Sequence, residues 1–139
     1  MTNDFGLLRL GGGDISFVPP YQPTFTQDNT MALFAVCMPI LPGKKEKWLQ
    51  KMDEIRQEPG RTFFRQSREA AGVHERSFLQ ETPHGDFVIL TFEGDNPAQG
   101  FGQIMANMPP DFAEFAKEVH GLDAGAPPPN ISLIVDTRD

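Results

Sequence analysis

The chain has 139 residues, a length typical of one domain that can bury a core of its own. Hydrophobic residues make up 39% and charged residues 22%, as in ordinary globular proteins. The net charge of -7 argues against nucleic acid or an anionic membrane as the main partner. No apolar run predicts a transmembrane helix, and we expect no secretory signal. Because Cys37 is the only cysteine, no internal disulfide can form, and a cytoplasmic location is expected.

Residues 1–30 are predicted to form an irregular N-terminal arm. Pro19, Pro20 and Pro23 are incompatible with a regular central strand in this region, because proline cannot donate a backbone hydrogen bond to a neighbouring strand. The rest of the chain, residues 31–139, is expected to form one α+β domain.

Hydrophobic periodicity and the positions of proline and glycine predict the elements of this domain. The predicted strands are 31–38, 73–82, 86–93 and 131–136, and the predicted helices are 44–57, 61–71, 97–107 and 111–120. Their order is strand, helical segment, strand, strand, helical segment, strand. This is the split βαβ pattern, so the predicted fold class is α+β, a ferredoxin-like βαββαβ domain with an antiparallel sheet.

Three predicted strands carry apolar side chains on both faces: 31–38, 86–93 and 131–136. An antiparallel sheet with one solvated face would instead alternate apolar and polar residues. The helices of this fold can cover only one face. A second copy related by a two-fold axis is therefore expected to cover the other face, giving a homodimer, with the N-terminal arm as the competing cover.

Several short pieces of sequence match a known group of proteins: Leu41-Pro42-Gly43-Lys44 with Trp48, Gly72 to Glu75, Leu79 to Asp86, Phe92 to Asp95, and Val119 to Asp123. On these pieces, the stretch from Pro39 to Asp123 resembles a set of uncharacterised bacterial proteins in the dimeric α+β-barrel superfamily. That superfamily includes cofactor-free monooxygenases of antibiotic biosynthesis, haem-degrading monooxygenases and small isomerases. The resemblance implies the fold and dimerisation more than any one activity.

Haem-degrading members of the superfamily use an asparagine on the first strand together with a tryptophan and a histidine. Trp48 and His120 are present here, but residues 31–38 contain no asparagine, so no haem is expected. The three histidines lack a metal-ligand spacing such as His-Glu-x-x-His, and no metal or other cofactor is predicted.

His120 is the candidate catalytic residue. It ends the predicted last helix, directly before Gly121. A histidine can act as acid or base near neutral pH. The structural alternative is that a cationic imidazole at this position is stabilised by the helix dipole.

Five residues are candidate ligand-binding residues: Trp48, His74, Arg76, Met105 and Phe112. Trp48, Met105 and Phe112 belong to a layer of aromatic and methionine side chains on the helices, which predicts either plain core or an adaptable apolar pocket. His74 and Arg76 share one face of strand 73–82. This polar row lines a ligand site if it faces the helices, pairs with a partner if it faces one, or is solvated if the strand is at an edge.

Two other features have simpler interpretations. Cys37 lies between Val36 and Met38 in an apolar strand, so it is expected to be a small core residue rather than a nucleophile. Residues 44–76 contain nine basic and six acidic side chains, which predicts either a solvated helix face or a patch for an acidic ligand.

These predictions favour a homodimer with an apolar cavity between sheet and helices that binds a small apolar or aromatic ligand. If the protein is an enzyme, the superfamily resemblance implies monooxygenase-like or isomerase-like chemistry without a metal. His120 would be the acid or base, and His74 or Arg76 would stabilise developing negative charge. The alternative is a non-enzymatic binding or stress-related dimer with no catalytic site.

Overall fold

The computed structural model describes residues 32–127 and 130–138. The described residues belong to two units: one contains 32–127 together with 130 and 131, and the other contains 132–138. The predicted N-terminal arm, residues 1–30, lies outside the described residues.

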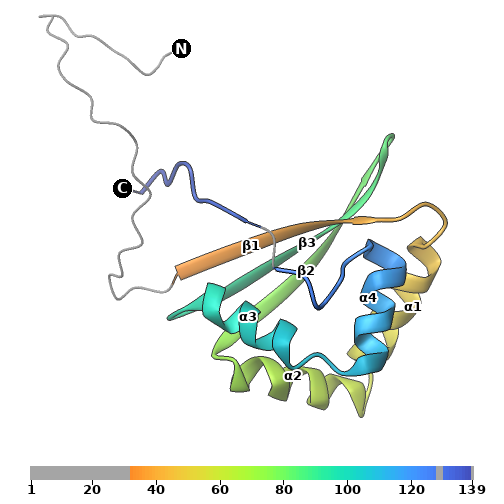
Figure 1. Ribbon diagram of the computed structural model, residues 1–139, viewed down its shortest axis with the longest axis horizontal. Coiled ribbons are helices and arrows are strands. Elements are labelled where there is room, and N and C mark those ends of the chain that lie inside the picture. Colours follow the sequence, from red (N-terminus) through yellow and green to blue (C-terminus); the bar gives the residue numbers. More distant parts are fainter. Residues whose placement is uncertain (1–31, 128–129, 139) are drawn as a thin grey trace, which may run out of the picture. The chain divides into compact units, whose positions relative to one another are not determined.

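The larger unit is an α+β fold with three strands and four helices between residues 32 and 120 (Figure 1). In chain order its elements are β1 (Ala32–Ile40), α1 (Lys45–Arg56), α2 (Gly60–Ala70), β2 (Val73–Thr82), β3 (Gly85–Gly94), α3 (Pro97–Ala106) and α4 (Pro110–His120). Each of these elements was predicted from the sequence, and the observed ends differ from the predicted ends by at most two residues.

The three strands form an antiparallel sheet in the order β1-β3-β2. The register places Val36 and Ser77 on either side of Leu90 in β3. The β2–β3 hairpin is tight: the Thr82 hydroxyl donates to the Gly85 carbonyl at 2.6 Å and accepts from the His84 amide at 3.1 Å. β3 is therefore the central strand, and β1 and β2 are the edges of the sheet within the described part of the chain.

The prediction of a fourth strand at residues 131–136 is wrong. This segment is neither helix nor strand in the structure, and apolar side chains on it, such as Ile134 and Val135, are exposed. An apolar run becomes a strand only where a neighbouring strand supplies its hydrogen bonds. The described chain therefore shows an α+β fold with a three-stranded sheet, and the ferredoxin-like topology is not shown.

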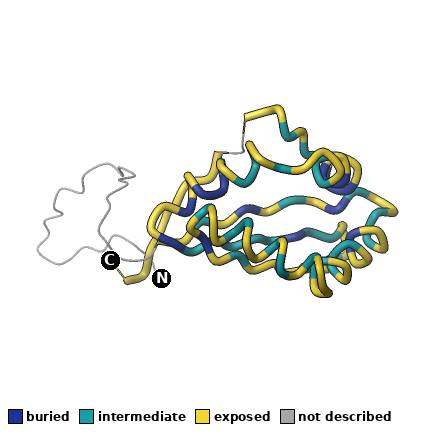
Figure 2. Tube along the Cα trace, turned by 90° about the horizontal axis from the view of Figure 1, so that it is seen from below, coloured by how far each residue is buried: buried dark blue, intermediate teal, exposed yellow. Residues whose placement is uncertain are grey.

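One face of the sheet is covered by the helices, and the core lies between them. Along β1, Val36 and Ile40 are buried while Leu33 and Ala35 are exposed, as expected when alternate residues point to opposite faces. Figure 2 shows buried positions interspersed with exposed ones along the strands. No helix among the described residues is long and apolar enough to cross a membrane.

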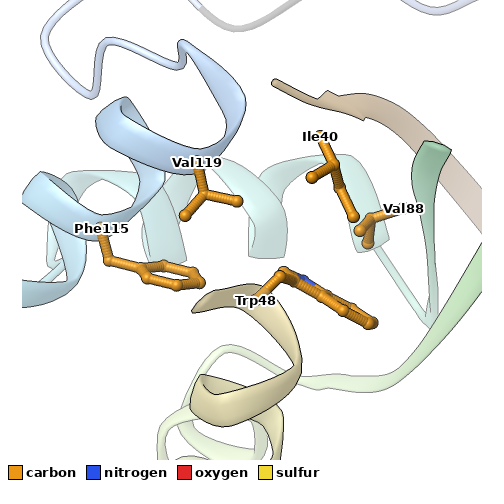
Figure 3. Close-up of a cluster of buried hydrophobic side chains, with 5 residues drawn as sticks. All are labelled: Ile40, Trp48, Val88, Phe115 and Val119. Carbon is orange, nitrogen blue, oxygen red and sulfur yellow. The ribbon is translucent and has the colours of Figure 1, made fainter. Parts of the chain in front are cut away.

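The core consists of two clusters of buried side chains. The first joins β1, α1, β3 and α4 through five residues whose side chains converge in Figure 3: Ile40, Trp48, Val88, Phe115 and Val119. The second joins β1, β2, β3 and α3 and contains Val36, Val73, Phe92 and Phe101. The first cluster thus holds α1 and α4 on the sheet, and the second holds α3.

A backbone hydrogen bond joins the end of α4 to the residue that follows β1. The backbone amide of Leu41 donates to the carbonyl of Val119 at 2.8 Å. Gly121 follows α4 with φ +69°, a left-handed conformation that glycine adopts without a steric penalty, and the amide of Leu122 returns to the carbonyl of Ala116. These contacts position His120, the last residue of α4.

Candidate functional site

A cavity of about 760 Å³ lies between the inner face of the sheet and the helices. This volume is within the range of small-molecule sites in proteins. All three strands and all four helices contribute to its lining, which is mostly aromatic, aliphatic and methionine side chains. Met38, Met52, Leu90 and Met108 are typical members. The cavity is therefore the best candidate for a functional site in the described chain.

The structure brings four of the six predicted site residues to this cavity. Trp48 reaches it from α1, Met105 from α3, and Phe112 and His120 from α4. Trp48 is also part of the first core cluster, and only 6% of its surface is exposed. Side chains of the aromatic and methionine layer therefore both pack in the core and line the cavity, as Trp48 does.

The other two predicted residues, His74 and Arg76, lie on the opposite face of the sheet. On β2 the inner positions are Val73, Glu75, Ser77 and Leu79, and the cavity is lined by three of them, Glu75, Ser77 and Leu79. Arg76 forms an ion pair with Glu93 of β3, which lowers the pKa of the Glu93 carboxyl. His74 and Arg76 therefore do not contact a ligand in this cavity.

His120 is buried and held in one orientation. Its Nδ1 lies 2.8 Å from the carbonyl oxygen of Pro39, which can only accept, so Nδ1 carries the proton. The ring also makes an edge contact with Phe115. Burial lowers the pKa of His120, and the hydrogen bond to Pro39 offsets part of this lowering. His120 is thus neutral at pH 7, and Nε2 is the ring nitrogen with a free lone pair.

This geometry changes the structural explanation for His120. Burial lowers the pKa of His120 rather than raising it, which argues against a cation stabilised by the helix dipole. The structural role is instead a hydrogen bond from the end of α4 to β1. Nε2 makes no hydrogen bond to any described residue, and His120 lines the cavity.

A buried ion pair in the cavity was not predicted from the sequence. Arg68 Nε of α2 donates to Glu75 Oε1 of β2 at 2.6 Å, and the two side chains are 14% and 5% exposed. Both residues line the cavity together with Ser77. The signal in the sequence was Glu75 itself, a charged residue on the same strand face as Val73 and Leu79.

A second cavity of about 600 Å³ adjoins the first on its helical side. The two share six lining residues: Ile55, Phe64, Arg68, Ile104, Met108 and Phe112. The guanidinium of Arg68 stands 3.8 Å from the centre of the Phe64 ring. The side chains of these shared residues therefore form a common wall between the two cavities.

Cys37 is not a core residue, contrary to the prediction. It is exposed on the outer face of β1, where its neighbour across the strand pair is Ile89. The prediction failed because an apolar strand does not reveal which face the helices cover. In the part of the chain that the structure describes, no three His, Cys, Asp or Glu side chains are grouped so as to hold a metal ion.

The resemblance to the dimeric α+β-barrel superfamily finds support only at the level of an α+β fold with an antiparallel sheet. No protein-family model matches the chain, and no significant match was found among curated proteins or solved structures.

Proposed function

We propose that this protein binds a small apolar or aromatic ligand in the cavity between sheet and helices. The observation that carries the proposal is the cavity of about 760 Å³, which has a largely apolar lining and a few buried polar groups on its wall. Ligand sites typically combine these two properties. Methionine side chains such as Met52 and Met105 suit such a site because they adapt to ligands of different shape.

The expected affinity follows from the area that a ligand buries. A ring system of side-chain size buries roughly 150–250 Å². At about 25 cal/mol per Å² this contributes about 4–6 kcal/mol. Simple aromatic probes should therefore bind with dissociation constants of roughly 1 mM to 50 µM.

A neutral fluorescent dye, N-phenyl-1-naphthylamine, tests the proposal because its emission rises in apolar surroundings. The dye is expected to bind at one site per chain. A cavity-filling variant, Met105→Phe, should weaken this binding, because the larger ring occupies space inside the site. Leu33→Phe adds a ring on the exposed outer face and is the matched control. The proposal fails if the dye does not bind, or if both variants bind it as the parent does.

A second role is favoured by the geometry of His120: general base in a proton transfer. Nδ1 is held by Pro39, and the neutral ring offers the Nε2 lone pair. In an isomerase-like reaction, Nε2 takes a proton from a ligand carbon next to a carbonyl. The electron pair moves to the carbonyl oxygen, and the proton returns to another carbon of the ligand. Arg76 lies on the other face of the sheet and cannot reach this oxygen. Arg68, whose charge is balanced by Glu75, lines the cavity and can donate hydrogen bonds to the oxygen instead.

Nitrogen-15 NMR of the imidazoles tests whether His120 Nε2 is available to a ligand. Added 2-naphthol, an aromatic hydroxyl donor, should shift the Nε2 resonance of His120 while Nδ1 stays bonded to Pro39. His74 and His84 lie outside the lining and serve as controls within the same spectrum. Bound 2-naphthol that leaves Nε2 unchanged would rule out this role.

A homodimer is proposed as the assembly, with the outer face of the sheet as the contact. Cys37, Ile89 and Phe78 form one apolar row across the three strands, and half of the Phe78 surface is exposed. Charged residues lie at one end of this face, where Arg76 pairs with Glu93. Apolar centre and charged border are the usual anatomy of an interface.

Sedimentation velocity at micromolar concentration tests the dimer. The parent should sediment as a dimer, and Phe78→Lys should sediment as a monomer, because a lysine in the apolar row would be buried without a partner. Phe63→Lys, at a position on α2 that is 64% exposed, should stay dimeric. A monomeric parent would contradict the proposal.

A further inference from the structure

The pair Arg68–Glu75 places two charged side chains, both mostly removed from water, on the wall of a largely apolar cavity. The two residues are seven positions apart on α2 and β2, and both side chains are mostly removed from water. Ion pairs elsewhere in the described chain are much more exposed, for example Arg76–Glu93 on the outer face. A structural role, in which the ion pair holds α2 against β2, explains the bond between the two charges. It does not explain the hydrogen-bonding groups that remain.

Arg68 has hydrogen-bond donors left over. Its Nε is used by Glu75, and Nη1 donates to the Ser67 hydroxyl at 2.7 Å. Phe64 covers one face of the guanidinium. Of the five N–H groups of an arginine, those on Nη2 have no acceptor among the described residues. Because the Arg68 side chain is only 14% exposed, a ligand that brings an acceptor supplies the partner that this donor lacks within the chain.

Glu75 has acceptor capacity left over. Oε1 accepts from Arg68, while Oε2 has only a long contact of 3.5 Å with the Ser77 hydroxyl. The side chain is 5% exposed, so water cannot fully replace the missing donor. The free donors of Arg68 and the free acceptor of Glu75 are adjacent, because one hydrogen bond joins the two side chains.

The charge of the pair restricts the ligand further. Arg68 and Glu75 neutralise each other, so an anionic ligand would bring an uncompensated charge into the cavity. A neutral group brings none. The matching group presents an acceptor to Arg68 and, beside it, a donor to Glu75.

We propose that the ligand of this cavity is a neutral ring-bearing molecule whose polar end has a carbonyl next to a hydrogen-bond donor, as in a primary amide or a hydroxy-ketone. The carbonyl accepts from Nη2 of Arg68, and the donor bonds to Oε2 of Glu75. This assignment rests on the proposed function of the cavity and adds the chemical class of its ligand.

Calorimetric titration with four naphthalene probes tests the assignment on the unmodified protein. 2-Naphthamide has the acceptor and the donor, N,N-dimethyl-2-naphthamide has only the acceptor, 2-naphthoate is an anion, and naphthalene has no polar group. Two hydrogen bonds to charged groups should make 2-naphthamide bind at least about tenfold more tightly than naphthalene. The dimethyl amide and the anion should both bind more weakly than 2-naphthamide.

A double variant tests which residues cause the preference. Arg68→Met with Glu75→Leu removes the pair without leaving one charge buried alone, and it should bind naphthalene and 2-naphthamide equally. The matched control, Arg65→Met with Glu69→Leu, removes an exposed Arg–Glu pair of α2 that does not line the cavity, and it should keep the preference.

The results separate the two proposals. If the parent binds naphthalene and 2-naphthamide equally, or if the Arg68/Glu75 double variant keeps the preference, the ligand class is wrong while the cavity remains a binding site. If no probe binds the parent, the proposed function itself fails. Because the comparison of the four probes uses the parent protein, it decides the question even where a variant does not fold.

Discussion

Nδ1 of His120 lies 2.8 Å from the carbonyl oxygen of Pro39, a residue 81 positions earlier in the chain. This hydrogen bond joins the last residue of α4 to the edge strand β1. It also determines the tautomer of the imidazole, because only Nδ1 can supply the proton. A single contact thus connects the packing of a helix on the sheet with the chemistry that His120 offers to the cavity.

The first prediction concerns the pH dependence of stability. The pKa of His120 lies below its ordinary value of 6.5 in the folded chain because the ring is buried. Between the two pKa values the unfolded chain binds more protons, so the free energy of unfolding should fall as the pH drops below 6.5 and level off below the folded pKa. Urea unfolding at about pH 7.5 and about pH 5.5 measures this difference.

His120→Gln removes the titrating group and should reduce this pH dependence. His84→Gln changes an exposed histidine of the hairpin and serves as the control. Above about pH 5.5 the carboxylates remain mostly ionised and contribute little. An unchanged pH dependence in His120→Gln would show that another group is responsible.

The second prediction concerns the aromatic part of the core. Phe92 is 1% exposed and packs against Phe101 at 5.2 Å between ring centres. Phe92→Ala should lower the free energy of unfolding by about 3–5 kcal/mol, because it removes buried area and leaves a void. Phe63→Ala, at a position 64% exposed on α2, should cost less than about 1 kcal/mol. Chemical denaturation compares them, and equal losses would contradict the observed packing.

The third prediction compares two glycines of α3. A Cβ at Gly100 would lie 2.7 Å from the carbonyl oxygen of Ala71 and 2.6 Å from a methyl group of Val73, whereas one at Gly102 would meet nothing within 4 Å. Gly100→Ala should therefore destabilise the fold, because backbone cannot give way easily. Gly102→Ala should stabilise it by up to about 1 kcal/mol through helix propensity. Thermal unfolding of both variants checks the opposite signs, and a shared sign would contradict the close approach of α3.

The fourth prediction concerns the energetics of the buried ion pair. Arg68→Met leaves Glu75 buried without its cation and should cost about 3–5 kcal/mol. The double variant Arg68→Met with Glu75→Leu should recover most of that loss, since an apolar pair of similar size can replace a buried ion pair. Arg76→Met on the outer face should have little effect. A double-mutant cycle from urea unfolding gives the coupling, and additive effects would mean that the pair is not coupled in solution.

The helices and three strands of the described chain were predictable from the sequence because their signals are local. Pro97 and Pro110 begin α3 and α4, and Gly72 and Gly121 follow the ends of α2 and α4. The spacing of Trp48 and Met52 on α1 identified a helix face that packs inward. Such signals need no knowledge of the rest of the fold.

Only the tertiary structure decided which residues form the site. The alternation along β2 separates the row of His74 and Arg76 from the row of Glu75 and Ser77, but it does not say which row faces the helices. The side of the sheet on which α2 packs decides this. It places Arg68 and Glu75 on the cavity wall, where they form their ion pair. The segment 131–136 does not form a strand, although its sequence predicts one. Pairing with a neighbouring strand also depends on the tertiary structure, which the residues of the segment do not specify.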